Sequence, residues 1–112
     1  MSEEQVALIW CPFPSCREAQ EIAQRLLEKK LIACANITPQ IISVFSWQGE
    51  IQSSEEVGVM MKTSKTKLAQ AIETLQVLHP YDAPAIAGWL ADAAPAATHQ
   101  WVAIATGEDE TQ

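Results

Sequence analysis

Val6-Ala-Leu-Ile-Trp-Cys11 is a continuous apolar run, and two prolines, Pro12 and Pro14, follow it closely. A short apolar run that ends at prolines is typical of a central strand covered on both faces. The next residues, Ser15-Cys-Arg-Glu18, have the S-x-x-E form of a helix capping box. We therefore predict a first strand, followed by an amphipathic helix that begins after Ser15 and ends near Lys29.

The middle of the chain is rich in strand-forming residues. Over residues 31–44, β-branched side chains collect around Pro39, which predicts one long strand or two short ones. Phe45-Ser-Trp-Gln-Gly-Glu-Ile51 resembles a hairpin that turns near Gln48-Gly49. The apolar run over residues 56–63 predicts a further strand, so this region is expected to pair back on itself.

A second helix and a last strand are predicted in the C-terminal half. Ser64 can cap a helix that Pro80 ends, and the apolar residues of this helix recur at helical spacing: Leu68, Ile72, Leu75 and Leu78. Residues 85–90 are expected to form the last core strand. Pro95 then suits the first turn of a short C-terminal helix that reaches about Ala105.

The order strand, helix, strand, strand, helix, strand is that of the split βαβ, or ferredoxin-like, unit. We predict an α+β fold of the broad α/β class, an antiparallel sheet with two helices on one face and a short C-terminal helix. The 112 residues suit one domain, 1–112, whose core spans about residues 6–105 and whose acidic tail covers 107–112.

Charge limits the possible partners. Seven Lys and Arg stand against fourteen Asp and Glu, so the formal net charge is -7. Phosphate backbones and anionic lipids repel such a surface, so we expect neither nucleic acid nor a membrane as a partner. The first residues lack the features of a signal peptide, which predicts a cytoplasmic protein whose three cysteines are reduced.

Common enzyme motifs are absent from the sequence, including the P-loop, G-x-G-x-x-G, G-x-S-x-G, H-E-x-x-H and Cys-x-x-Cys. We therefore expect a protein that is not an enzyme and that needs no organic cofactor. One catalytic alternative stays open, because Cys11 or Cys34 can approach His79 in space as a nucleophile and base do.

Several short motifs follow one another over nearly the whole chain: Ala33-Cys-Ala-Asn36, Phe45-Ser-Trp-Gln-Gly49, Glu56, Lys62-Thr63 and His79-Pro-Tyr-Asp-Ala-Pro84. In order and spacing, over about residues 6–104, they resemble the divalent-cation tolerance (CutA) proteins. The resemblance implies a ferredoxin-like fold related to that of the PII signalling proteins. It also implies a tightly packed homotrimer and an association with copper and other divalent metals.

The chain departs from the family pattern at three places. Ala85 stands where the family commonly has Glu, and Leu78 stands where some copper-associated members have a second His. Residues 88–94 also differ from the usual aliphatic-Pro-aliphatic continuation. These departures concern the predicted last strand and the metal ligands.

Two residues are candidate metal ligands. The resemblance links the positions of Cys11 and His79 to copper, and thiolate and imidazole are donors that copper prefers. The structural alternative is a buried Cys11 and a His79 that only caps the end of a helix. Cys16 falls in the first turn of a predicted helix, and Cys34, flanked by alanines, is expected in the core.

A second group of residues is expected between subunits. Phe45 and Trp47 form an aromatic pair on the predicted hairpin, and such pairs often anchor an interface. From the resemblance, Glu56 and Lys62 are expected to form a charged pair in a subunit cleft with Tyr81.

The sequence thus predicts a homotrimeric, metal-responsive or metal-binding protein of the divalent-cation tolerance type. The alternative is a PII-like signalling or scaffold trimer that binds a protein or small molecule, with incidental metal binding.

Overall fold

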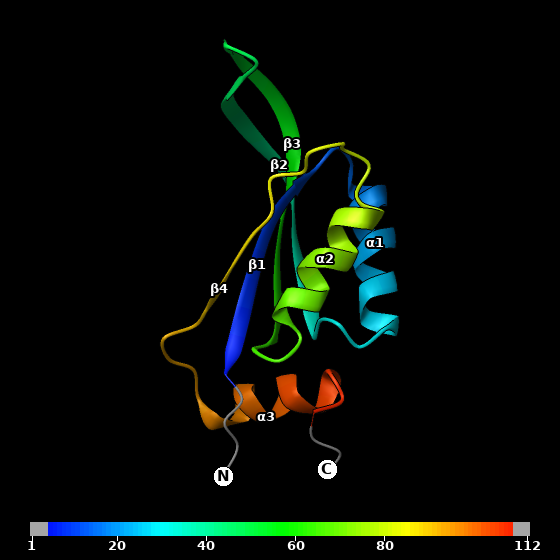
Figure 1. Cartoon of the computed structure of the whole chain (residues 1–112), viewed down its shortest axis with the longest axis vertical. Helices are drawn as coiled ribbons and strands as arrows, with labels where there is room; N and C mark the ends of the chain where they lie inside the picture. Colours follow the sequence, from blue (N-terminus) through cyan, green and yellow to red (C-terminus); the bar gives the residue numbers. More distant parts are fainter. Residues whose placement is uncertain (1–4, 109–112) are drawn as a thin grey trace.

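The computed structural model describes residues 5–108 and contains four strands and three helices within this range (Figure 1). In chain order they are β1 (Val6–Phe13), α1 (Cys16–Glu28), β2 (Cys34–Trp47), β3 (Glu50–Ser64), α2 (Leu68–Leu78), β4 (Ala87–Leu90) and α3 (Ala96–Ala105). The sheet order is β2-β3-β1-β4, and each neighbouring pair is antiparallel. This is the ferredoxin-like arrangement that the sequence predicts.

Local signals set the start of α1 as expected but not the start of α2. The Ser15 hydroxyl oxygen accepts a 3.2 Å hydrogen bond from the backbone N–H of Glu18, and this caps α1. The Ser64 hydroxyl oxygen accepts from the backbone N–H of Lys67 at 3.2 Å. Since α2 begins only at Leu68, Ser64 caps the intervening turn and not the helix itself.

The middle of the chain forms one long hairpin. Of the two alternatives for residues 31–44, one long strand is therefore correct and two short strands are not. The turn lies at Gln48 and Gly49, whose φ angles of 51° and 81° are the positive values that a tight two-residue hairpin turn needs. The strand register shifts between Thr38 and Ile41, where Pro39 cannot donate a ladder hydrogen bond.

The boundaries of all four strands differ from the prediction. β2 covers Cys34–Trp47 where 31–44 was predicted, and β3 covers Glu50–Ser64 where 56–63 was predicted. β1 runs two residues further than expected, because Pro12 is accommodated opposite Gly58 and the strand ends at Phe13. β4 begins at Ala87 and not at Ala85, and is only four residues long.

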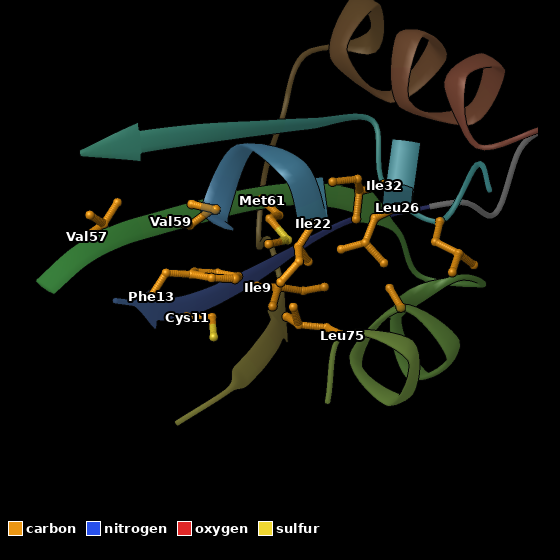
Figure 2. Packing of buried hydrophobic residues seen from close by; sticks show 13 residues of the cluster. Ile9, Cys11, Phe13, Ile22, Leu26, Ile32, Val57, Val59, Met61 and Leu75 are labelled. Carbon is orange, nitrogen blue, oxygen red and sulfur yellow. The ribbon is translucent and has the colours of Figure 1, made fainter. Parts of the chain in front are cut away.

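The main core lies between the sheet and helices α1 and α2, which lie side by side on one face (Figures 1 and 2). Ile9, Cys11 and Phe13 of β1 pack there with Val59 and Met61 of β3. Successive side chains of a strand point to opposite faces. The residues between these core positions therefore lie on the other face, which we call the open face: Leu8, Trp10, Met60, Lys62, Cys34, Asn36 and Trp89.

Helix α3 covers only one end of the open face, where Val102 packs against Val6 and Ala33. At the opposite end, β2 and β3 extend beyond the helices as a projecting hairpin, residues 41–56, which we call the arm (Figure 1). The molecule therefore measures 49 × 26 × 22 Å. Within residues 5–108, the helices are all too short or too polar to span a lipid bilayer.

Candidate functional site

His79 lies where the end of α2, the end of β1 and the following loop meet. Its Nε2 lies 2.9 Å from the carbonyl oxygen of Pro12, and its Nδ1 accepts a 3.1 Å hydrogen bond from the backbone N–H of Tyr81. A carbonyl can only accept, so the network assigns the proton to Nε2. The ring packs at centroid distances of 4.4 Å from Phe13 and 4.9 Å from Tyr81. Burial lowers the pKa of His79, so the neutral ring is favoured.

Tyr81 connects the place where α2, β1 and the following loop meet, which we call the corner, to the base of the arm. Its hydroxyl donates a 2.7 Å hydrogen bond to Oε2 of Glu56 on β3. Burial, followed by this bond to a carboxylate, raises the pKa of Tyr81. The phenol therefore stays protonated and remains a donor at neutral pH.

Cys11 is fully buried beside the same corner (Figure 2). Its thiol lies 3.4 Å from the carbonyl oxygen of Pro12, the atom that His79 also contacts. Burial, and then the negative charge of Glu56, raises the pKa of the Cys11 thiol to about 12. The thiol is therefore protonated at neutral pH, whereas metal binding and nucleophilic attack need the thiolate.

The donor types of this corner fit Cu(I), but their present arrangement does not form a metal site. Cys11 and His79 face one carbonyl, and both imidazole nitrogens of His79 are already in hydrogen bonds. Over residues 5–108, no three or more His, Cys, Asp or Glu side chains gather to hold a metal ion. Cys11 and His79 also lack the mutual hydrogen bond of a nucleophile and base.

Cys34 differs from the expectation that it lies in the core. It is half-buried on the open face, because its neighbour Ala35 is the residue of β2 that points toward the helices. Since His79 packs on the helix side of the sheet, against Phe13, the fold separates Cys34 from that imidazole. Cys16, in the first turn of α1, packs at the edge of the core as expected.

The arm carries Phe45 and Trp47, which are exposed on this chain. Three further apolar residues, which the sequence analysis did not single out, are more exposed: Ile42 at 71%, Val44 at 69% and Ile51 at 83%. Their signal in the sequence is their β-branched character, which by itself indicates only a strand.

Lys62 is not part of the Tyr81 and Glu56 pair within the chain. It lies six residues beyond Glu56 along β3, and its ammonium group contacts Oδ1 of Asn36 at 3.5 Å. Glu56, Lys62 and Tyr81 are expected together in a subunit cleft. Within one chain, only Glu56 and Tyr81 contact each other.

Comparison with known proteins places this fold and these residues in a family. Residues 7–105 match the family described as CutA1 divalent ion tolerance protein. The chain belongs to this family. It is 37% identical over 83 residues to the divalent-cation tolerance protein CutA of Thermococcus kodakarensis, covering 74% of this chain and 79% of the relative. It is 44% identical over 78 residues to that of Archaeoglobus fulgidus, covering 70% and 76%.

Solved structures of the family have the same fold. The crystal structure of divalent ion tolerance protein CutA1 from Ehrlichia chaffeensis superposes with a TM-score of 0.88 at 37% identity, covering 94% of this chain and 98% of that one. The periplasmic divalent cation tolerance protein CutA from Archaeoglobus fulgidus superposes with a TM-score of 0.85 at 34% identity, covering 90% and 98%. The family resemblance predicted from the short motifs is thus confirmed.

Proposed function

We propose that this CutA chain works, without catalysing a reaction, as a homotrimeric module that binds or responds to divalent cations or copper. Self-association is the part of the proposal that the geometry supports best. The observation that carries it is the arm, whose most exposed apolar side chain, Ile51, is 83% accessible in the single chain. Ile51 lies on the same face of the arm as Ile42 and Val44, and exposed apolar residues grouped in this way often mark an interface.

The open face supplies a surface on which such an arm can pack. Leu8, Trp10 and Met60 lie there with Trp89 of β4, and neither α1 nor α2 covers this side of the sheet. An arm that packs on the open face of the next copy makes a head-to-tail contact, and three such contacts can close a ring. Closure also protects the free edge of β2, which has no neighbouring strand outside it within residues 5–108.

Cys11 and His79 would hold the metal, as soft donors for Cu(I). For this, the Cys11 thiol has to lose its proton and His79 has to give up one of its two hydrogen bonds. Two donors are few for a tight site, so Cys16 or a neighbouring subunit is needed to complete the coordination. A bound Cu(I) ion would supply a cross-link between β1 and the end of α2.

The second candidate function is a signalling or scaffold trimer, similar to the PII proteins, in which metal binding is incidental. The engaged imidazole of His79 and the protonated thiol of Cys11 favour this alternative, since a dedicated copper site would present free donors. Affinity for Cu(I) separates the two functions.

Light scattering at micromolar concentration tests the assembly, and a trimer mass is expected. Ile51→Ser should shift the mass toward the monomer, whereas Val77→Ser should not. Val77 is the matched control because it is 79% exposed but lies on α2, away from the arm. A monomeric wild type, or equal effects of the two substitutions, would contradict the proposed assembly.

Competition against a Cu(I) chelator tests the metal function on the same reduced protein. Tight binding supports the metal-responsive trimer. A trimer that loses Cu(I) to a weak chelator supports the signalling or scaffold alternative.

A further inference from the structure

A shallow groove of about 560 Å³ lies on the helix side of the molecule, along α1 and beside the end of α2. The two helices lie side by side there (Figure 1). The apolar floor of the groove consists of Ile22, Leu78 and Pro80. Ile22 and Leu78 also pack in the main core, so the contact between the helices and the sheet fixes this floor. A volume of this order is typical of ligand sites.

The wall that α1 contributes to the groove is mainly acidic. Three carboxylates and one guanidinium line it: Glu18, Glu21, Glu28 and Arg25. Since these positions follow one another at spacings of three or four residues, they lie on one face of the helix. Beyond Glu28 the groove continues to Lys29. The part of the groove near Pro80 therefore has a net negative charge, and its other end does not.

The carboxylates of this wall can accept further donors. Glu21 lies 3.8 Å from a guanidinium nitrogen of Arg17, but the two side chains are 62% and 81% exposed, so this ion pair is weak. Glu28 accepts a 3.4 Å hydrogen bond from the side-chain amide of Gln24. Within residues 5–108, Arg25 forms no ion pair with either carboxylate. An ionised carboxylate has about four acceptor positions, so both glutamates keep positions for a partner.

The groups in the groove match a peptide better than a single cation. The guanidinium of Arg25 lies on the same face as the carboxylates, and its N–H groups can donate to carbonyl oxygens of a peptide backbone. A bare cation offers Arg25 no acceptor and is repelled by it. In a peptide, basic side chains complement the carboxylates, and an apolar side chain complements the floor. Complementary charges of this kind select the partner and fix its orientation.

We infer that this groove binds a basic segment of a partner protein, with an apolar side chain against Leu78 and flanking Lys or Arg side chains paired with Glu21 and Glu28. The groove lies on the opposite side of the sheet from the open face, so an arm packed on the open face leaves it accessible. The inference deepens the scaffold alternative, on which its biological use rests. The binding itself does not require the trimer.

Fluorescence polarisation with a capped synthetic peptide tests the groove on the full-length protein. The probe has the central sequence Lys-Leu-Lys. One control peptide has glutamate in place of both lysines, and the other has serine in place of the leucine. We expect the probe to bind at low ionic strength and both control peptides to bind more weakly. In an NMR titration with the probe, the backbone amides that shift should be those of residues 18–28.

A matched pair of variants separates the groove from a general attraction to an acidic protein. Glu28→Gln removes one carboxylate of the groove and should weaken binding of the probe about threefold, the usual effect of one exposed ion pair. Glu73→Gln is the control, because Glu73 is also an exposed glutamate on a helix but does not line the groove. It should bind the probe as the wild type does.

The inference is wrong if the two variants bind the probe equally, if either control peptide binds as tightly as the probe, or if the amides that shift lie on the open face. A wild type that is monomeric in light scattering contradicts the proposed trimer but does not affect the peptide titration. The two failures are therefore distinguishable.

Discussion

The Tyr81 hydroxyl donates a 2.7 Å hydrogen bond to Oε2 of Glu56, and this bond ties the loop after α2 to the strand from which the arm projects. The two residues are 25 positions apart in the sequence, and their contact completes a corner that also contains His79 and Phe13. The loop and the arm are thus coupled through one side-chain contact.

Removal of this bond should loosen the corner. We expect Tyr81→Phe to lower the free energy of unfolding by about 1 kcal/mol, the usual net value of one hydrogen bond. Urea unfolding measures it. In a double-mutant cycle with Glu56→Gln, the two effects should be less than additive, because both substitutions alter the same bond. Strict additivity would show that the contact does not contribute to stability.

Stability should depend on pH through His79. Burial lowers its pKa from 6.5 in the folded chain, so below 6.5 the unfolded chain takes up a proton that the folded chain excludes. The contribution of His79 is therefore complete above pH 6.5 and is lost as the pH falls through this value. The slope can reach about 1.4 kcal/mol per pH unit.

Urea unfolding between pH 5.5 and 7.5 measures this dependence. His79→Gln, which cannot titrate, should have a flatter profile below pH 6.5 than the wild type. His99→Gln serves as the control for loss of the other histidine. If His79→Gln retains the wild-type slope, other groups cause the pH dependence.

Trp47 should contribute to self-association. Trp47→Ala removes a half-exposed indole from the arm, and aromatic residues at an interface often contribute 2 kcal/mol or more, so the concentration for half-dissociation should rise about thirtyfold. Trp101→Ala is the control, since Trp101 is similarly exposed but lies on α3. Analytical ultracentrifugation over a dilution series compares them. Equal dissociation of the two variants would place Trp47 outside the interface.

Binding of Cu(I) should follow the protonation of Cys11. Because the pKa of its thiol is about 12, binding has to displace a proton, and the apparent affinity should rise about tenfold per pH unit near neutrality. Cys11→Ser and His79→Ala should each weaken binding more than Cys34→Ser. Competition with a Cu(I) chelator gives the ranking, with folding checked by circular dichroism. Equal losses for Cys11→Ser and Cys34→Ser contradict the assignment.

Local signals made much of the fold predictable. The capping box at Ser15 and the turn at Gln48-Gly49 depend on neighbouring residues alone, and both lie where the sequence placed them. The accommodation of Pro12 inside β1 was not predictable in this way, because it depends on Gly58 of a strand far along the chain. A proline alone indicates that a strand ends. Whether the strand continues depends on the residue opposite the proline on the neighbouring strand, here Gly58.

The candidate site was less predictable, since it depends on contacts between distant segments. The sequence singled out His79 but not its bond to Pro12, which lies 67 positions away. The family resemblance also grouped Lys62 with Glu56 and Tyr81 in a subunit cleft, and between subunits this grouping stays a prediction. Six residues of an extended strand span about 20 Å, so Lys62 and Glu56 of one chain cannot share a contact.

The length of the arm means that the chain is not equally stable along its long axis. β1 pairs with β3 only as far as Val57, so the rungs from Ile42 and Glu55 to Trp47 and Glu50 form a ribbon of two strands. Such ribbons are marginally stable alone. In deuterated solvent, the backbone amide protons of the arm of a free chain should exchange quickly through local fraying. Those of Val59 and Met61 should exchange only when the whole chain unfolds. The slow-exchanging region would then lengthen toward the hairpin turn only when another molecule holds the arm closed.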